Sequence, residues 1–137
     1  MLKPLGITES ALYVDDLERA VRFYTSLFGA PVLRRDERFT ALEINAQQVL
    51  LLFLRGGSRQ PSSIDGGTIP AHDGAGPLHV CFGMGDDEVS AWKQQLDGLG
   101  ITIESRVNWP NGAVSLYFRD PDGHAVELAT PGLWHTS

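Results

Sequence analysis

The sequence predicts an α+β fold built from two copies of one βαβββ module. Residues 16–29 and 87–100 each begin with an acidic residue and end in a glycine, which are typical start and stop signals of a helix. A β-rich run precedes each helix, at residues 9–14 and 79–84. Further strand-like runs follow each helix, so both halves have the same order of elements.

The first half contains the clearest helix signal. Asp15 or Asp16 can cap the free amides of the first turn, and Gly29 can end the helix in a left-handed conformation. The residues between them form an apolar stripe at helical spacing, which predicts an amphipathic helix. The stripe consists of Leu17, Ala20, Val21, Tyr24, Leu27 and Phe28.

Strands are predicted after each helix from alternation or from short apolar runs. In the first half these are residues 39–44 and 49–54, separated by a turn at 45–47. Residues 55–77 are rich in Gly, Ser and Pro and show neither period, so we expect a linking loop. In the second half we expect a strand at 78–84, a helix at 87–99 and strands at 101–106, 112–119 and 124–130.

The bulk properties suit one domain over residues 1–137, with module one at about 5–54, a linking loop at about 55–77 and module two at about 78–131. A net charge of −6 without clustered Lys or Arg argues against a nucleic-acid partner. No apolar run reaches the length of a membrane span, and Cys81 is the only cysteine. We therefore expect a cytoplasmic protein that binds a small molecule, and neither nucleic acid nor a membrane.

One face of the predicted sheets has the composition of a site. Side chains alternate along a strand, so Glu9, His79 and Glu127 lie on faces whose other residues are small or polar. Burying unpaired carboxylates is costly, and a divalent cation would remove that cost. We therefore predict that these three residues bind a metal. The same-face neighbours are Ala11, Tyr13, Cys81, Gly83, Ala125 and Ala129.

Each of these residues also has a structural interpretation. A single Glu at a strand end is usually solvated, and a single His on a sheet is more often a hydrogen-bonded structural residue than a ligand. Cys81 is either a further metal ligand or a small apolar filler. His72, in the linking loop, either reaches the mouth of the site or is solvated.

Three stretches resemble the vicinal oxygen chelate superfamily, which comprises glyoxalases, bleomycin-resistance proteins and extradiol dioxygenases. They are residues 14–29, residues 76–80 and the strand-turn-strand segment 115–128. The resemblance covers almost the whole chain. It implies that the two modules form an open, barrel-like mixed sheet around a divalent metal, with the helices outside.

The resemblance also implies a ligand set. The family's ligand positions lie at the start of the first strand of each module and near the end of its last strand, and they carry Glu9, His79 and Glu127 here. The fourth position falls within 49–54, which has only apolar side chains. Three protein ligands would leave positions open to water or substrate, on a metal that is Zn, Ni, Mn, Co or Fe.

The ligand types favour one branch of the family. Glu9 stands where dioxygenases and fosfomycin-resistance relatives carry His, and ferrous oxygen chemistry usually uses two His and one carboxylate. We therefore expect a glyoxalase I-like lyase or isomerase whose small substrate chelates the metal through adjacent oxygens, with Glu127 or Glu9 as general base. The alternatives are a metal-dependent dioxygenase and a non-catalytic protein of the bleomycin-resistance type.

Other residues of the same faces are candidates for substrate binding. Tyr13 shares the face of Glu9, and Tyr117 and Arg119 lie in a neighbouring strand. The structural alternative for Arg119 is a salt bridge with the adjacent Asp120. We also expect a homodimer, because one βαβββ half-sheet cannot enclose a cavity, with Glu9 from one chain and the other two ligands from its partner.

Overall fold

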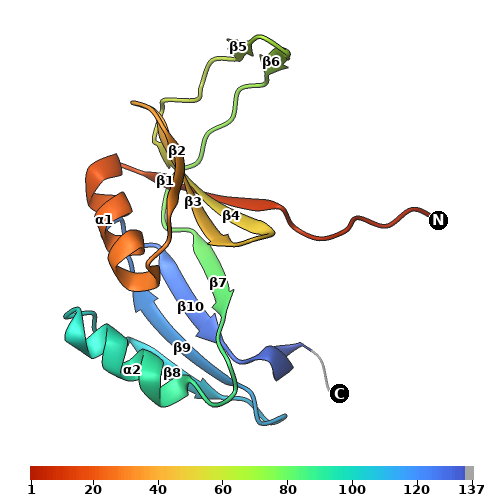
Figure 1. Cartoon of the computed structure of the whole chain (residues 1–137). Coiled ribbons are helices and arrows are strands. Elements are labelled where there is room, and N and C mark those ends of the chain that lie inside the picture. Colours follow the sequence, from red (N-terminus) through yellow and green to blue (C-terminus); the bar gives the residue numbers. More distant parts are fainter. Residues whose placement is uncertain (135–137) are drawn as a thin grey trace. The chain divides into compact units, whose positions relative to one another are not determined.

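The computed structural model of the chain describes residues 1–134. It contains two compact units, Met1–Gly76 and Pro77–Ser137, called here the first and the second unit. In the described residues each unit has one α-helix and a four-stranded sheet, in the same order along the chain (Figure 1). The predicted duplication is therefore confirmed, and with it the α+β class of two βαβββ modules.

The first unit has a mixed sheet in the order β1-β4-β3-β2, in which β1 and β4 are parallel. The repeat β1-α1-β2-β3-β4 is completed before the chain enters the linking segment. The elements are β1 Glu9–Val14, α1 Leu17–Phe28, β2 Val32–Arg35, β3 Phe39–Asn45 and β4 Gln48–Leu54.

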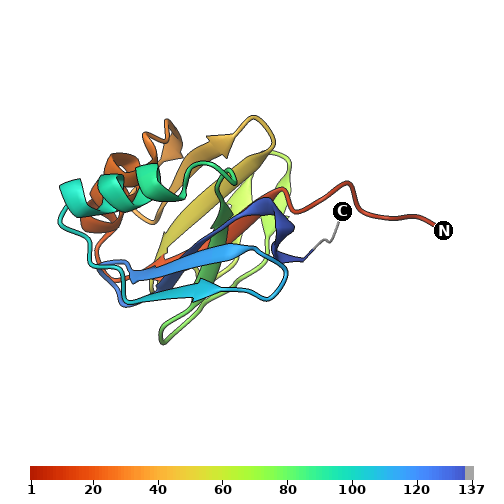
Figure 2. The ribbon, with the colours of Figure 1, turned by 90° about the horizontal axis from the view of Figure 1, so that it is seen from below.

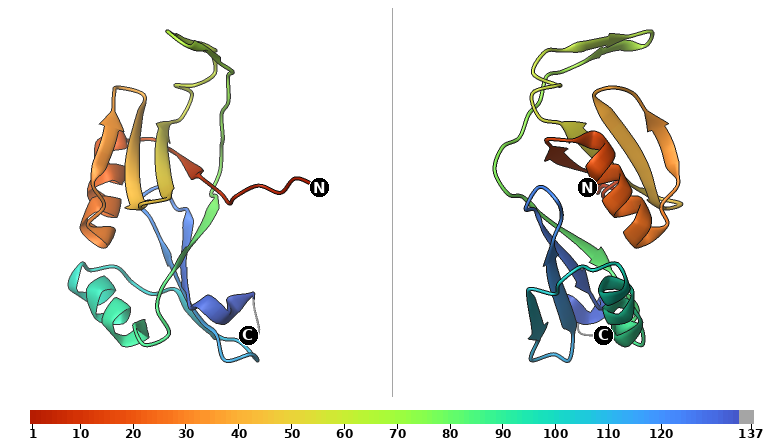
Figure 3. Two further views of the ribbon diagram at one scale, coloured as in Figure 1. Left: turned by 45° about the vertical axis from the view of Figure 1, so that its right-hand side comes forward. Right: turned by 90° about the vertical axis from the view of Figure 1, so that its left-hand side faces the viewer.

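Helix α1 begins and ends at the predicted residues. The Asp16 side chain accepts a hydrogen bond from the Arg19 amide, and Gly29 adopts φ 61° while its amide bonds the Thr25 carbonyl at 2.8 Å. The helix packs against β3 and β4 (Figure 3, right). Its buried residues, together with Leu12, Val14, Leu42, Leu50 and Leu52 of the sheet, form the core of the unit.

The second unit repeats this topology, with the sheet order β7-β10-β9-β8 and parallel β7 and β10. Helix α2 lies beside the sheet (Figure 1). Its residue Leu96 is buried. The apolar residues Leu116, Phe118, Val126 and Leu128 complete the core. The elements are β7 His79–Gly83, α2 Val89–Gly98, β8 Ser105–Asn108, β9 Val114–Arg119, β10 Ala125–Ala129 and a 3-10 turn Pro131–Leu133.

Several parts of the structure differ from the sequence prediction. Strand β2 lies in a segment for which no strand was predicted, and α2 begins at Val89 and not at residue 87. The linking segment contains a short hairpin of β5 Ser62–Ile64 and β6 Gly67–Ile69, too short to show a period in the sequence (Figure 1). Strand β8 begins four residues after the predicted start at 101. Ile101 still belongs to the end of the helix, since its amide donates a hydrogen bond to the Leu96 carbonyl. A turn between Trp109 and Ala113 sets the register of β8 on β9.

Residues 1–8 extend from β1 as an arm without regular structure (Figures 1 and 2). Among residues 1–134, no helix is long and apolar enough to cross a membrane.

Candidate metal centre and substrate cavity

His79 and Glu127 meet on the open face of the second unit's sheet. In the parallel pair of β7 and β10, His79 is opposite Ala125, so Glu127 lies two residues further along the neighbouring strand. Nε2 of His79 is 3.0 Å from Oε1 of Glu127. The Glu127 side chain is 5% exposed and that of His79 is 54% exposed, so a buried carboxylate stands behind an accessible imidazole.

Two neighbours hold the Glu127 carboxylate in place. The buried Ser115 hydroxyl donates a 2.6 Å hydrogen bond to Oε2 of Glu127, and the Trp109 indole N–H donates to the same hydroxyl oxygen at 2.9 Å. Only Oε1 is left to face His79. The sequence did not predict that Ser115 and Trp109 support this carboxylate. The available signal was the position of Ser115, two residues before Tyr117 and therefore on the same face.

Tyr117 and Cys81 flank the pair. The Tyr117 ring stacks on His79 with centroids 6.4 Å apart, and burial together with the Glu127 carboxylate raises the Tyr117 pKa. Cys81 belongs to an exposed part of the strand, but partial burial of its thiol and the charge of Glu127 raise its pKa to about 12. Both side chains are therefore protonated near neutral pH.

Arg119 is engaged at the edge of the same sheet. Its Nε and Nη2 atoms donate to the two carboxylate oxygens of Glu104, each at 3.1 Å, and Nη1 donates to the Gly123 carbonyl. This pairing raises the pKa of Arg119 and lowers that of Glu104. The expected salt bridge between Arg119 and Asp120 is therefore wrong, because the partner of Arg119 is Glu104. Oδ1 of Asp120 accepts hydrogen bonds from backbone amides in the turn before β10.

His124 has a structural role that the sequence analysis did not assign. Its side chain is fully buried, and its Nδ1 accepts a 2.8 Å hydrogen bond from the amide of Leu78. Leu78 directly precedes His79, so this bond ties the start of β7 to the turn that leads into β10.

Glu9 lies in the first unit, opposite Val49 in the pair of β1 and β4. Repeat equivalence places Leu51 where the second unit has Glu127, since each lies two residues beyond the partner of the opening residue. The position in the first unit that is equivalent to Glu127 is therefore apolar. Among residues 1–134, neither unit by itself brings three His, Cys, Asp or Glu side chains close enough to hold a metal ion.

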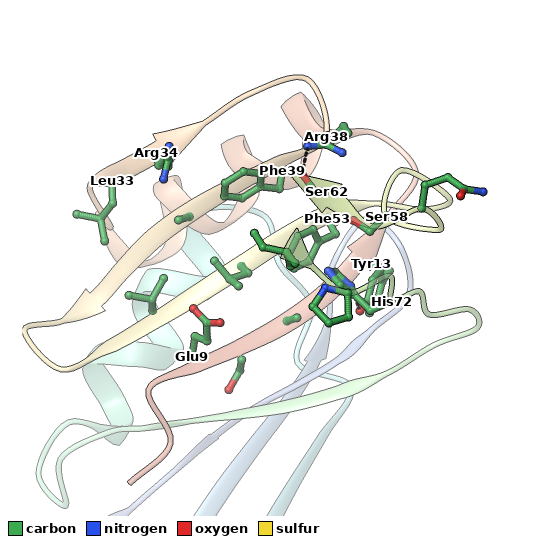
Figure 4. Close-up of a pocket in the computed structure, with 18 residues that line it drawn as sticks. Glu9, Tyr13, Leu33, Arg34, Arg38, Phe39, Phe53, Ser58, Ser62 and His72 are labelled. Carbon is green, nitrogen blue, oxygen red and sulfur yellow. Dashed lines mark hydrogen bonds between the residues drawn. The ribbon is translucent and has the colours of Figure 1, made fainter. Parts of the chain in front are cut away.

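Glu9 and Tyr13 line a cavity of about 690 Å³ on the open face of the first unit (Figure 4). Strand register arranges its floor in rows. Phe53 has Tyr13 on one side and Phe39 on the other, and the next row consists of Ala11, Leu51 and Ala41. Arg34, Arg38 and residues of the linking segment form its rim. The sequence analysis did not identify Phe39 and Phe53 as cavity residues. The two-residue alternation of their strands was the sequence signal that could have identified them.

His72 belongs to this cavity. Its Nδ1 is 2.7 Å from the Tyr13 hydroxyl, and its ring meets Phe53 edge-on with centroids 4.5 Å apart. The next residue, Asp73, accepts hydrogen bonds from Nε of Arg59 at 2.9 Å and from the Gly56 amide. The expectation of a solvated loop histidine is therefore wrong, because the linking segment is folded onto the sheet face.

Comparison with known proteins gives consistent results. The family model described as Glyoxalase/Bleomycin resistance protein/Dioxygenase superfamily matches residues 6–128. Metallothiol transferase FosB of Bacillus licheniformis is 29% identical over 129 residues, which cover 93% of this chain and 77% of that protein. Catechol-2,3-dioxygenase of Bacillus subtilis is 29% identical over 120 residues, which cover 85% of this chain and 38% of that protein.

A solved structure is similar over the full length. The crystal structure of lactoylglutathione lyase from Agrobacterium tumefaciens is 36% identical, with a TM-score of 0.88, over 97% of this chain and 98% of that one. The chain therefore belongs to the glyoxalase, bleomycin resistance protein and dioxygenase superfamily.

Proposed function

We propose that the protein is a divalent-metal-dependent enzyme of the glyoxalase-like branch, a lyase or isomerase. Its substrate would be a small molecule that chelates the metal through two adjacent oxygens. The observation that carries the proposal is the convergence of His79 Nε2 and Glu127 Oε1 at 3.0 Å. The similarity to a protein named lactoylglutathione lyase supports the choice of branch.

The paired donor atoms fit a cation. Two ligands at about 2.1 Å from a metal lie roughly 3.0 Å apart when they subtend about 90° at it. The two atoms of His79 and Glu127 have this separation. An imidazole nitrogen with carboxylate oxygens suits Zn, Ni, Mn, Co or Fe. Glu9, which is exposed in the wall of its cavity, is the proposed third ligand.

The side chains around the pair suit proton transfer next to a developing negative charge. When bound, the divalent ion would supply Lewis-acid stabilisation to the chelating oxygens of the substrate. Glu127 is held through Oε2, so Oε1 would accept a substrate proton by exchanging metal ligation for general-base work, and Glu9 is the alternative base. Tyr117, protonated at neutral pH, can donate a hydrogen bond to a substrate oxygen.

The site is proposed to be shared in a homodimer. The proposed ligands belong to different units, and a half-sheet with one open face needs a second surface to enclose a substrate. Glu9 of one chain and His79 with Glu127 of the other would then complete each site. Closed two-fold dimers are the commonest oligomers and give two such sites at once.

Metal analysis tests the proposal. Protein purified without chelators should carry a stoichiometric divalent ion, and adding Zn, Ni, Mn or Fe to stripped protein should raise its Tm. Glu9→Gln, His79→Ala and Glu127→Gln should each abolish the Tm shift, whereas Glu18→Gln on the exposed side of α1 should not. A wild-type protein without metal or any Tm shift, or wild-type shifts in all three variants, would contradict the proposal.

A dioxygenase is the second candidate, favoured by the similarity to a protein named catechol-2,3-dioxygenase. Anaerobic reconstitution with Fe(II), followed by a catechol and a measurement of oxygen uptake, distinguishes the two. Oxygen consumption that depends on Glu127 would replace the lyase or isomerase proposal. Binding of small molecules without any metal dependence would instead support a non-catalytic binding protein.

A further inference from the structure

We propose that the substrate has a flat aromatic body and an anionic group, and that the cavity of the first unit recognises both. The inference deepens the proposed function, since it names the substrate class of the same site. It is carried by the cavity wall alone, whose residues all belong to the first unit.

The aromatic part of the proposal rests on a continuous row of rings. Tyr13 and Phe53 stack with centroids 5.7 Å apart and an interplanar angle of 25°, and Phe53 and Phe39 stack at 5.7 Å and 28°. His72 meets the central ring, that of Phe53, in a T-shaped arrangement (Figure 4). Such a row offers ring faces and edges to a flat ligand, which gains both burial and ring-ring contacts.

Room for that ligand comes from the adjacent row. Ala11 and Ala41 flank Leu51 there. The small side chains of the two alanines leave space above the sheet beside the larger aromatic side chains. Glu9 lies one row further, four residues from Tyr13, which is about 13 Å along a strand. A ligand lying along β1 can therefore place its reacting end at Glu9 and its flat body against the rings.

The anionic part rests on two arginines of the rim. Nη2 of Arg38 contacts only a hydroxyl, that of Ser62, at 3.3 Å. The side chain of Arg34, which lies opposite Ala41 in the ladder of β2 and β3, forms no ion pair or hydrogen bond with a residue in the described part of the chain. Glu9 is the sole carboxylate among the described lining residues, and it lies at the metal-binding end. Two guanidinium groups without a carboxylate partner form a binding site for a carboxylate, phosphate or sulfonate.

His72 adds a positioned polar atom between these features. Its Nδ1 is occupied by Tyr13, while its Nε2 has no hydrogen-bond partner among residues 1–134 and is available to a ligand. Asp73 and its contacts to Arg59 and Gly56 hold the segment in place. Recognition therefore combines an aromatic row, a cationic rim and a polar contact from His72.

The test uses calorimetric titration of the metal-free, full-length protein with three probes. Naphthalene-2-sulfonate has both features, naphthalene-2-sulfonamide lacks the charge and cyclohexanesulfonate lacks the aromatic rings. We expect naphthalene-2-sulfonate to bind at least about 10-fold more tightly than either of the other two probes. This factor is in line with the strength of charged hydrogen bonds and ring contacts. Equal affinity for all three, or no binding of naphthalene-2-sulfonate, would overturn the inference.

Variants assign the two features. Arg34→Gln and Arg38→Gln should each weaken naphthalene-2-sulfonate about 10-fold and leave the sulfonamide unchanged. Arg35→Gln is the matched control, because Arg35 lies in the same strand but lines a hollow that includes α1 residues on the other face. A loss with Arg35→Gln equal to that with Arg34→Gln would refute a specific anion site. Phe53→Leu should remove the preference over cyclohexanesulfonate.

This test is separate from that of the metal centre. Glu127→Gln should leave naphthalene-2-sulfonate binding unchanged while it abolishes the metal-dependent Tm shift. Probe binding without any metal binding would reject the proposed enzyme and retain the ligand class. Metal binding without selectivity among the probes would reject the proposed ligand class and leave the proposed enzyme in place.

Discussion

The hydroxyl of Ser115 and the carboxylate of Glu127 share a 2.6 Å hydrogen bond in the buried part of the second unit's sheet. The bond occupies Oε2 and leaves Oε1 at 3.0 Å from Nε2 of His79. A residue that binds no metal itself thus sets which oxygen of the proposed ligand is presented. Partners of this kind orient ligands and influence metal affinity.

Ser115→Ala should therefore weaken binding of Zn or Mn by about 10-fold or more without abolishing it. The carboxylate would lose the donor that orients it and could rotate. Competition against a chromogenic chelator measures the affinity. Ser105→Ala, an exposed serine of β8, is the control and should retain wild-type affinity. Equal affinities for the two variants would show that the Ser115 contact does not position the ligand.

Complementation should reveal the shared site. Glu9→Ala protein and His79→Ala protein should each fail to bind metal tightly, and mixing them under conditions of subunit exchange should restore one site per heterodimer. The reason is that one of the two sites in the heterodimer then combines Glu9 from one chain with His79 and Glu127 from the other, all unsubstituted. Metal content after exchange is the measurement, with native mass spectrometry to verify the heterodimer. A monomer by sedimentation, or proven exchange without recovery, would refute the shared site.

Gly74→Ala should destabilise the protein by about 1–3 kcal/mol, in the range of overpacking substitutions. A Cβ at Gly74 would overlap the Tyr13 ring, so either the ring or the segment carrying His72 must shift. Gly66→Ala, where a Cβ would meet open space, should change the free energy of unfolding by less than about 0.5 kcal/mol. Urea unfolding measures both. Similar values for the two variants would mean that the segment does not pack tightly on Tyr13.

Acid should weaken the anchoring of the His72 segment through Asp73. The Arg59 hydrogen bond, followed by those of the Gly56 and Gly74 amides, holds the pKa of Asp73 below its ordinary value of 3.8. A lowered folded-state pKa means that the stabilisation is present above the unfolded-state pKa and is lost as pH falls through the folded-state value. Stability should therefore decline below about pH 4 partly because Asp73 becomes protonated.

Asp73→Asn should lower the free energy of unfolding at pH 7 and make its decline toward pH 3 shallower. Urea unfolding at pH 7, 5 and 3 gives the comparison. Asp65→Asn, in the turn of the β5-β6 hairpin, should follow the wild-type profile. Identical pH profiles for Asp73→Asn and wild type would remove Asp73 as the source of the acid sensitivity.

Local patterns predicted much of the first unit. The residues Asp16 and Gly29 marked the ends of α1, and the alternation from Glu9 to Tyr13 placed both on one face. These features depend on capping and on the two-residue period of a strand, which involve neighbours in the chain. The repeat also predicted matching topologies for the two halves, because equivalent patterns give equivalent elements.

Contacts between distant residues escaped the same reasoning. The start of β8 depended on its pairing with β9, and the pairing of Arg119 with Glu104 depended on which side chain lay across the strands. The orientation of the Glu127 carboxylate depends on its hydrogen bond with Ser115. Sequence spacing placed Ser115 on the same face but did not predict this hydrogen bond.

The sequence by itself determined the family resemblance, the duplication, the limits of α1 and the faces that carry Glu9, His79 and Glu127. Only the tertiary structure decided that His79 and Glu127 meet, and that His72 folds onto Tyr13 across 59 positions of chain. The physical reason is that side-chain alternation is a local property of the backbone. Strand register and the path of a linking segment are instead set by hydrogen bonds and packing between residues far apart in the chain.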